Sequence, residues 1–370
     1  MNILYFSFHD FATHLFERNV RNMRFLSMWL ISVLTASAAL VFLSSYKAVP
    51  EAEAAQDPSP DERLALWQIM SSEKELPEVN KEEITEEKLN IQVYAHKSGA
   101  YMEMPLDEYL YGVLLAEMPS SFGDEALKAQ AVAARTLALY KEGGKYPSDH
   151  PHSPLCTSSG HCMAYLSPED YIKAAGEGGA DFLSRVKSAV VSTSGQVLCY
   201  DGKPIMAAFH ASSYEKTESS LEVWGAELPY LCSVSTPEHL YPERVKGLFT
   251  EKSFEPMELL SLIKDAVPSN AVAAASLKKD VVTQKSDAGR ISYVKIGDCV
   301  MTGKEIRSRL SLRSTDFDVS LADGKAVFSV RGHGHGVGMS QYGANIMDFL
   351  GKSYTEILSH YYPCTELATF

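Results

Sequence analysis

The chain has 370 residues, of which 45% are hydrophobic and 22% are charged, and its formal net charge at pH 7 is −13. This composition is typical of a folded globular protein with enough chain to bury a core. The acidic excess argues against a nucleic-acid-binding protein, because such a protein needs a basic face for the phosphates.

The first feature in chain order is an apolar segment. Residues 25–43 form a run of 19 residues without a charge, about the length that a helix needs to cross a bilayer. Three arginines precede the run and one lysine follows it closely: Arg18, Arg21, Arg24 and Lys47. The positive-inside rule then places residues 1–24 in the cytoplasm and the rest outside. A cleaved signal peptide is the alternative, but the leader is long and no clear small-residue cleavage site ends the run.

The segment after this anchor is acidic and contains prolines, which predicts a stalk over residues 44–89. A single globular domain is expected over 90–370. It opens with a strand and a glycine turn, followed by helices over 106–118 and 124–144. Residues 188–213 favour strand, turn and strand, 257–267 a helix, 289–310 two strands and a helix, and 326–362 a strand, a glycine-rich loop and helices. Strands and helices mix without regular alternation, which predicts an α+β fold.

The segment "HPHSPLCTSSGHC" at residues 150–162 is the strongest local signal. Histidine and cysteine side chains together favour zinc in tetrahedral geometry. Four protein ligands would close the site and make it structural, whereas three would leave a position for water and permit catalysis. A disulfide between Cys156 and Cys162 is the alternative. The other cysteines are dispersed and are expected to be buried free thiols, with one disulfide as the alternative: Cys199, Cys232, Cys299 and Cys364.

Glu117 is a candidate general acid. It ends an apolar stretch and lies just before Pro119, where a helix tends to stop. A carboxyl at the edge of an apolar segment is poorly solvated, so it can stay protonated near neutral pH. The alternative is an ordinary solvated residue at a helix end.

Two further segments carry polar residues suited to carbohydrate. Residues 209–225 combine a histidine, several hydroxyls, a glutamate and a tryptophan, although the same mixture suits an ordinary polar loop. In "RGHGHGVGMSQYGA" at 331–344, His333 and His335 would lie on one face of an extended chain. Such a pair could bind a metal, line a groove or form a structural turn.

Four blocks of the sequence, in order, resemble one family. They are "AEMPSSFGDEALKAQAVAARTLAL", "FHASSYEKTESSLEVWG", "MTGKEIRSRLSLRSTDF" and "GHGHGVGMSQYGA". Together they resemble the stage II sporulation protein D family, membrane-anchored lytic transglycosylases of spore-forming bacteria related to amidase enhancers. The resemblance covers roughly residues 90–365, and the N-terminal anchor agrees with it.

The resemblance implies roles for individual residues. Glu117 matches the catalytic acid, and a structural zinc beside the cleft would be held by His150, Cys156, His161 and Cys162, with His152 as a possible replacement for His150. Residues expected to bind substrate along a groove are His210, Ser212, Ser213, Thr217, Glu218, Trp224, His333, His335, Gln341 and Tyr342.

The resemblance also implies an activity. A single glutamate would act first as acid and then as base, cleaving the bond between N-acetylmuramic acid and N-acetylglucosamine in denuded peptidoglycan to leave 1,6-anhydro ends. Ordinary glycosidases use two carboxylates instead. The implied setting is engulfment during sporulation, on the mother-cell side of the septum. The implied partners are an amidase-endopeptidase and a membrane scaffold protein. Alternatives are a zinc-dependent amidase or peptidase and a non-catalytic wall-binding protein that enhances an amidase.

Overall fold

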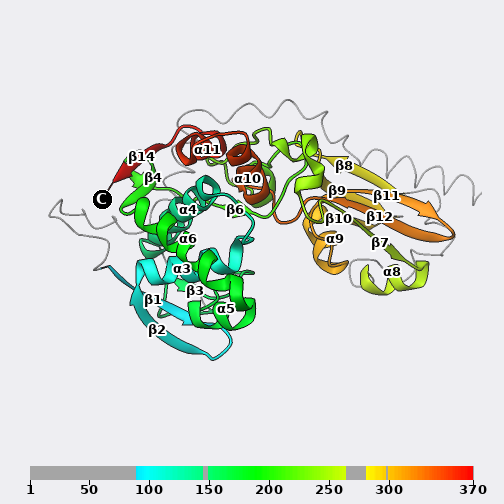
Figure 1. Cartoon of the computed structure of the whole chain (residues 1–370). Coiled ribbons are helices and arrows are strands. Elements are labelled where there is room, and N and C mark those ends of the chain that lie inside the picture. Colours follow the sequence, from blue (N-terminus) through cyan, green and yellow to red (C-terminus); the bar gives the residue numbers. More distant parts are fainter. Residues whose placement is uncertain (1–88, 145–148, 264–280, 297–298, 370) are drawn as a thin grey trace, which may run out of the picture. The chain divides into compact units, whose positions relative to one another are not determined.

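A computed structural model of the chain describes residues 89–144, 149–263, 281–296 and 299–369 (Figure 1). The predicted anchor and stalk lie outside these residues. Within the described part, none of the helices has the length and apolar character required to cross a membrane. The described residues form a mixed α+β fold, as the sequence predicts, and their buried side chains gather mainly around two large hydrophobic cores.

The first core is built on helices. Helices α3 (Leu106–Glu117), α4 (Asp124–Glu142) and α6 (Gly179–Ser192) pack against one another. Helix α4 is buried along most of its length, and many of its buried residues are alanines, which let neighbouring helices approach closely. We call this part the helical region.

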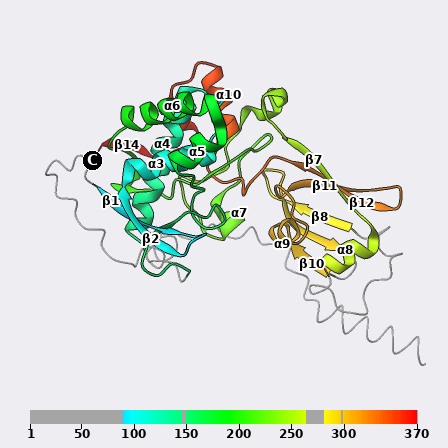
Figure 2. The ribbon, with the colours of Figure 1, turned by 60° about the horizontal axis from the view of Figure 1, so that its bottom comes forward.

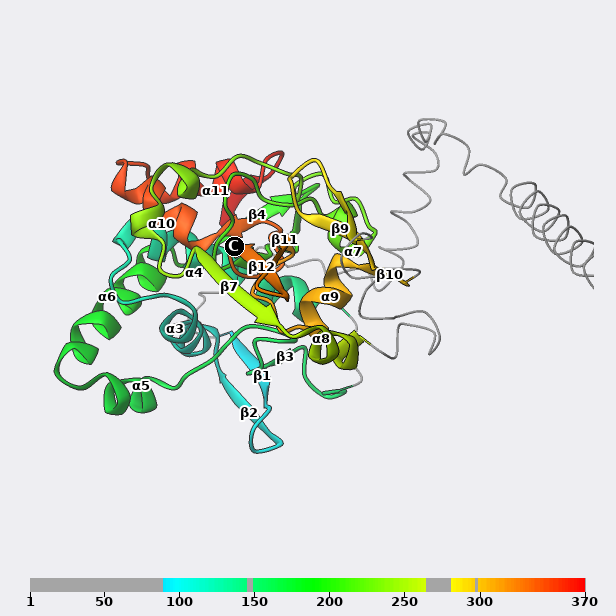
Figure 3. The same ribbon diagram turned by 90° about the vertical axis from the view of Figure 1, so that its right-hand side faces the viewer.

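Short strands and further helices complete the helical region. The antiparallel hairpin β1–β2 also pairs with β3, which runs parallel to β1, and Figure 3 shows the hairpin beside β3. Strand β4 lies between β14 and β5, and β6 pairs with β13. The strands are β1 (Asn90–Ala95), β2 (Ala100–Pro105), β3 (Leu155–Cys156), β4 (Gln196–Tyr200), β5 (Lys203–Pro204), β6 (Phe209–His210), β13 (Met339–Ser340) and β14 (Glu366–Thr369). The remaining helices are α5 (Pro168–Ala175), η2 (Gly176–Gly178), α7 (Ser220–Trp224), η3 (Pro237–Leu240), η4 (Pro242–Arg244), α10 (Gln341–Phe349) and α11 (Tyr354–Tyr361).

The second core lies between two antiparallel sheets of three strands, in the orders β11–β12–β7 and β10–β9–β8 (Figure 2). Along β12 every second residue is buried, namely Ala326, Phe328 and Val330, as expected of a strand with one face on a core. We call this part the β-rich region. Its elements are β7 (Phe249–Phe254), α8 (Pro256–Ile263), β8 (Val281–Lys285), β9 (Ile291–Ile296), β10 (Cys299–Thr302), α9 (Gly303–Arg309), β11 (Asp316–Ala322) and β12 (Lys325–Arg331).

Most of the predicted elements are present, but one prediction was wrong. The segment 188–192 was expected to be a strand but forms the end of α6. The buried residues of that helix, Phe182, Val186, Ala189 and Val190, recur at helical spacing once the pattern is followed from 182. The expectation failed because the β-branched pair at 190 and 191 was considered without the preceding turn.

Candidate active site

Glu117 is the last residue of α3 and lies partly buried. Its Oε1 accepts a 2.7 Å hydrogen bond from the backbone N–H of Ala164, and its Oε2 accepts a 3.3 Å bond from Nε2 of Gln341. Burial raises the pKa of the Glu117 carboxyl, and the two hydrogen bonds offset part of that rise. The net result is a carboxyl that holds its proton to a higher pH than a solvated glutamate.

Two tyrosines fix the backbone that donates to Glu117. The ring of Tyr165, next to Ala164, stacks on Tyr109 with 5.8 Å between ring centroids. It lies so close to Gly112 that a Cβ there would come within 2.2 Å of the ring. Leu166 N–H also donates to the Gly112 carbonyl at 3.1 Å. Segment 164–166 is therefore held against α3, and its Ala164 N–H donates to the Glu117 carboxylate.

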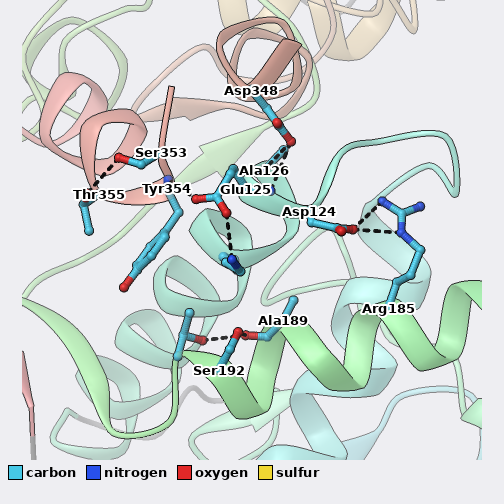
Figure 4. Close-up of polar contacts among 12 residues, drawn as sticks. Asp124, Glu125, Ala126, Arg185, Ala189, Ser192, Asp348, Ser353, Tyr354 and Thr355 are labelled. Carbon is cyan, nitrogen blue, oxygen red and sulfur yellow. Dashed lines mark hydrogen bonds and ion pairs between the residues drawn. The ribbon is translucent and has the colours of Figure 1, made fainter. Parts of the chain in front are cut away.

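The other donor, Gln341, is positioned by the junction of α10 with α4. The Asp348 carboxylate of α10 accepts hydrogen bonds from the N–H groups of Glu125 and Ala126, at 3.1 and 3.2 Å (Figure 4). This carboxylate satisfies free N–H groups at the start of α4, where negative charge is favourable. Because α10 is fixed in this way, its first residue, Gln341, reaches Glu117.

Four side chains from the opening segment converge as a candidate metal centre. The ligand atoms of His150, Cys156, His161 and Cys162 all lie within 4.8 Å of one another. His150 Nε2 is 2.9 Å from His161 Nδ1, and Cys162 Sγ is 3.4 Å from the same nitrogen and 3.8 Å from His150 Nε2. Around a tetrahedral zinc, nitrogen and sulfur ligands lie roughly 3.3–3.8 Å apart. Both distances from Cys162 Sγ fall in this range, whereas the two histidine nitrogens lie closer together, and the set of donor atoms suits zinc.

The surroundings of the cluster also suit a metal. His150 Nδ1 lies 2.6 Å from the carbonyl oxygen of Ser153, a contact that orients the ring and leaves Nε2 free for a metal. Burial raises the pKa of the Cys156 thiol to about 11, and the neighbouring Cys162 adds to the rise. Two adjacent thiolates are unfavourable without a cation, which a metal would provide.

His152 does not join this cluster. It is exposed, and its ring packs against Tyr101 at 5.8 Å. Cys156 and Cys162 are free thiols in the structure. Cys199 is buried as expected, but Cys232 and Cys364 are exposed, so the expectation of burial was wrong for these two. The side chain of Cys299 lies outside the described residues.

Several of the predicted substrate-binding residues are buried in hydrogen-bonded loops. His210 lies 2.7 Å from the Ser213 hydroxyl through Nε2 and 3.2 Å from the Val337 carbonyl through Nδ1. Ser212 exchanges backbone hydrogen bonds with His333. The buried residues of this set are His210, Ser212, Ser213, Thr217, Glu218 and Gln341. Their side chains hold the loops together, and a direct contact of these residues with substrate stays a prediction.

The more accessible members of the set are Trp224, His333, His335 and Tyr342. Trp224 is 37% exposed and its ring centroid lies 5.5 Å from that of His335. Burial lowers the pKa of His335 to about 4, and the charges of Arg290 and Arg307 lower it further. His335 is therefore neutral at physiological pH. Tyr342 packs edge-on against Phe122 at 4.9 Å.

His333 is exposed, and its Nδ1 accepts a 3.0 Å hydrogen bond from Arg313. No third metal-binding side chain of the described part of the chain clusters with His333 and His335, so the alternative of a metal site there gets no support. Among the described residues, the only group of three or more clustered ligands is the one around Cys156.

Sequence reasoning missed three groups. The first is the Ala164 N–H. The second is Glu238, which is fully buried and accepts hydrogen bonds from Ser213 N–H and from the hydroxyls of Thr236 and Ser340. The third is Arg290, which is 2% exposed and donates to the Ser213 hydroxyl at 2.9 Å. No local pattern marks them, because all three act through distant segments.

Known proteins resemble this chain over most of its length. The family model described as "Stage II sporulation protein" matches residues 94–200. The chain is 32% identical to stage II sporulation protein D of Bacillus subtilis and 31% identical to that of Bacillus amyloliquefaciens. The first match covers 76% of this chain and 79% of the relative, and the second covers 77% and 80%.

A further relative, at 29% identity, is the amidase enhancer of Bacillus subtilis, with 70% of this chain and 40% of that protein covered. The two stage II sporulation protein D relatives, unlike the amidase enhancer, are matched over most of both chains. The chain therefore belongs to the stage II sporulation protein D family, a family of sporulation proteins.

Proposed function

We propose that this chain is a lytic transglycosylase that cleaves the bond between N-acetylmuramic acid and N-acetylglucosamine in denuded peptidoglycan. One observation carries the proposal: Glu117 is a partly buried carboxyl with a raised pKa, held by two hydrogen-bond donors. Among the described residues, no second carboxylate is one of the groups that shift this pKa. A single-carboxyl reaction fits this arrangement better than a paired-carboxylate hydrolysis.

In the first step Glu117 acts as a general acid. Its protonated carboxyl donates the proton to the glycosidic oxygen while the bond from that oxygen to C1 of the muramic residue breaks. The carboxylate that remains is stabilised by Ala164 N–H and by the Gln341 amide. These donors are already in place, so little reorganisation is needed as the negative charge develops.

In the second step the same carboxylate acts as a base. It takes the proton from the C6 hydroxyl of the muramic residue while that oxygen forms a bond to C1. The product carries a 1,6-anhydro ring, no water is consumed, and Glu117 returns to its protonated form. The raised pKa favours both steps, because it keeps the proton before cleavage and makes the carboxylate a better base afterwards.

The proposed role of zinc is structural. Bound by His150, Cys156, His161 and Cys162, it would have four protein ligands and no position for a water. Cys162 precedes Ala164 by two residues, so a metal on Cys162 would hold the segment that donates to Glu117. Two thiolates and two imidazoles are a common set for structural zinc.

We further propose that residues 25–43 anchor the chain in the mother-cell membrane, with the catalytic part outside the cytoplasm. The engulfment machinery would supply its partners. An amidase-endopeptidase would strip the stem peptides and so produce denuded strands, and a membrane scaffold protein would hold the two together. The name of the amidase-enhancer relative supports a partnership with an amidase.

The test is product analysis by mass spectrometry. Purified protein incubated with denuded glycan strands should release fragments lighter by one water than hydrolysis products, and Glu117→Gln should not. Products of ordinary hydrolysis from these strands, or release of stem peptides from intact peptidoglycan that stops at once with a chelator, would indicate a zinc hydrolase instead. A protein that leaves the strands intact but accelerates an added amidase would be a non-catalytic enhancer.

A further inference from the structure

Arg290 is a buried cation whose hydrogen-bonding capacity is only partly used. One of its nitrogens donates to Ser213, while Nε and one terminal nitrogen are buried without a partner in the described part of the chain. Its guanidinium lies against Gly336 so closely that a Cβ there would come within 2.5 Å of it. A buried guanidinium with free N–H groups is costly unless negative charge lies nearby.

A second arginine, Arg307, lies near Arg290. Arg307, on helix α9, is partly exposed, and its guanidinium makes no hydrogen bond or ion pair to any residue that the structure describes. A Thr302 capping box fixes the start of α9 and therefore the place of Arg307. The charge of Arg307 lowers the pKa values of His210, His333 and His335, so it lies near all three.

The nearby acids are already engaged. Asp316 forms a 2.6 Å ion pair with Arg331, and Glu218 accepts hydrogen bonds from Ser219 N–H and the Ser286 hydroxyl. Within the described residues, no carboxylate is among the groups that shift the histidine pKa values at 210, 333 and 335. Burial lowers the pKa of Arg290, and the charges of Asp316, Glu218 and Glu238 partly offset this. No carboxylate is among the groups that shift the pKa of Arg307, so within the described residues Arg307 is the cation left without a negative partner.

The geometry points to a carboxylate subsite at Arg307, backed by Arg290, that binds the lactyl group of a muramic residue. Removal of the stem peptide turns the amide at this lactyl group into a free carboxylate, and a guanidinium matches a carboxylate with two parallel hydrogen bonds. N-acetylglucosamine carries no such group. The inference rests on the proposed function and adds a reason why denuded strands would be preferred.

Neighbouring residues fit this assignment. The partly exposed Trp224 ring offers a flat apolar surface for a sugar face beside His335, whose pKa burial and the charges of Arg290 and Arg307 lower. The chain continues from His335 to Gln341, which contacts Glu117. Six residues of chain span at most about 20 Å, so the subsite and the acid are both within reach of one glycan strand.

Binding can be measured without turnover in full-length Glu117→Gln protein in detergent micelles. The probes are denuded strands with free lactyl carboxylates, the same strands after methyl esterification, and oligomers of N-acetylglucosamine. We expect the free-carboxylate strands to bind about tenfold or more tightly than the esterified ones. Adding Arg307→Met should remove that difference and leave binding of the other two probes unchanged.

Arg309→Met is the matched control. Arg309 lies on the same helix, but its side chain donates to the Leu262 carbonyl at 3.4 Å, and its variant should bind all three probes as the parent does. Salt provides a measurement that needs no variant, because only binding of the free-carboxylate strands should weaken as NaCl rises. Equal affinity for free and esterified strands, or equal losses in the Arg307 and Arg309 variants, would overturn the inference.

The two proposals fail in different ways. If wild-type protein forms anhydro products and binds esterified and free strands with equal affinity, the subsite is wrong and the proposed activity stands. If binding depends on the carboxylate and on Arg307 but no anhydro product forms, the activity is wrong and the anion site stands.

Discussion

The helical region and the β-rich region contribute different kinds of residue. The helical region holds Glu117 and the four candidate metal ligands, on or beside helices that pack closely through alanines. The β-rich region supplies Arg290, Arg307 and Arg313, which surround the histidines of the glycine-rich loop. If Glu117 supplies the proton and Arg307 recognises the charge of the substrate, as proposed, these two functions rest on separate cores. Changes in the first should act mainly on kcat, and changes in the second mainly on KM.

The two cores differ for a physical reason. A carboxyl with a raised pKa needs a rigid and poorly solvated position, which the end of a buried helix provides. A cation that meets a charged substrate must remain accessible, and Arg307 on the short helix α9 is only partly buried. Five expected outcomes follow for residues of the helical region, from the largest effect to the smallest.

Replacing the acid should have the largest effect. Glu117→Gln should lower the rate of anhydro-product formation by about 10²–10⁴-fold, because the proton donor is lost. Glu108→Gln, at an exposed position on the same helix, is the control and should keep full activity. Formation of anhydro product by the Glu117 variant at the wild-type rate would remove Glu117 from the mechanism.

The same variant should keep or gain thermal stability. The folded-state pKa of Glu117 is raised, so its protonated form is favoured on folding. That stabilisation is present below the unfolded-state pKa and is lost as pH rises through the folded-state pKa. The melting temperature of Glu117→Gln, relative to wild type, should therefore be higher at pH 8 than at pH 4. A lower Tm at both pH values would mean that Glu117 supports the fold.

Removing the metal should have the second largest effect, and it should act by destabilising the fold. Cys156→Ser should lower zinc content and Tm together, with a loss of roughly 4 kcal/mol if zinc is present at a thousandfold its Kd. Activity should fall with the folded fraction and slowly after addition of a chelator. Cys232→Ser, at an exposed thiol, should change neither quantity. An immediate loss of activity at unchanged Tm would instead assign the metal a catalytic role.

Removing the exposed indole should have a smaller effect, confined to binding. Trp224→Ala should raise KM by about tenfold, because stacking on an aromatic ring contributes roughly 1–1.5 kcal/mol beyond its buried area, and kcat should change little. Leu221→Ala, on the same helix and 51% exposed, should leave both constants unchanged. A fall in kcat without a change in KM would show that Trp224, which lies on α7 of the helical region, acts on the chemical step rather than on binding.

The smallest effect is expected at Gln341, as a shift of the pH profile. Its side chain lowers the pKa of Glu117, so Gln341→Ala should raise that pKa. The acid would then stay protonated to higher pH, and the basic limb of the kcat profile should move upward. A limb that stays in place, together with a raised KM, would show that Gln341 binds substrate rather than tuning the acid.

Much of the fold was predictable because its signals are local. Acidic residues in the first turn of α4 and glycine after it mark that helix, and the alternation along β12 marks a half-buried strand. The clustering of the four candidate metal ligands was predictable because all lie within thirteen residues. The same local reasoning failed at 188–192, where a short apolar run fits either a strand or a helix. The presence of two hydrophobic cores within residues 90–370 could not be predicted, since both cores have the same kind of composition.

The sequence by itself determined the family, and it singled out Glu117 and the four candidate metal ligands, because each is carried by a short and distinctive block. Only the tertiary structure decided what surrounds the acid. Ala164 donates to Glu117 from 47 residues away and Gln341 from 224 residues away. The gathering of Arg290 and Arg307 near the histidines likewise depends on how distant segments pack. A pKa is set by everything within a few ångströms of the group, and chain order does not record that distance.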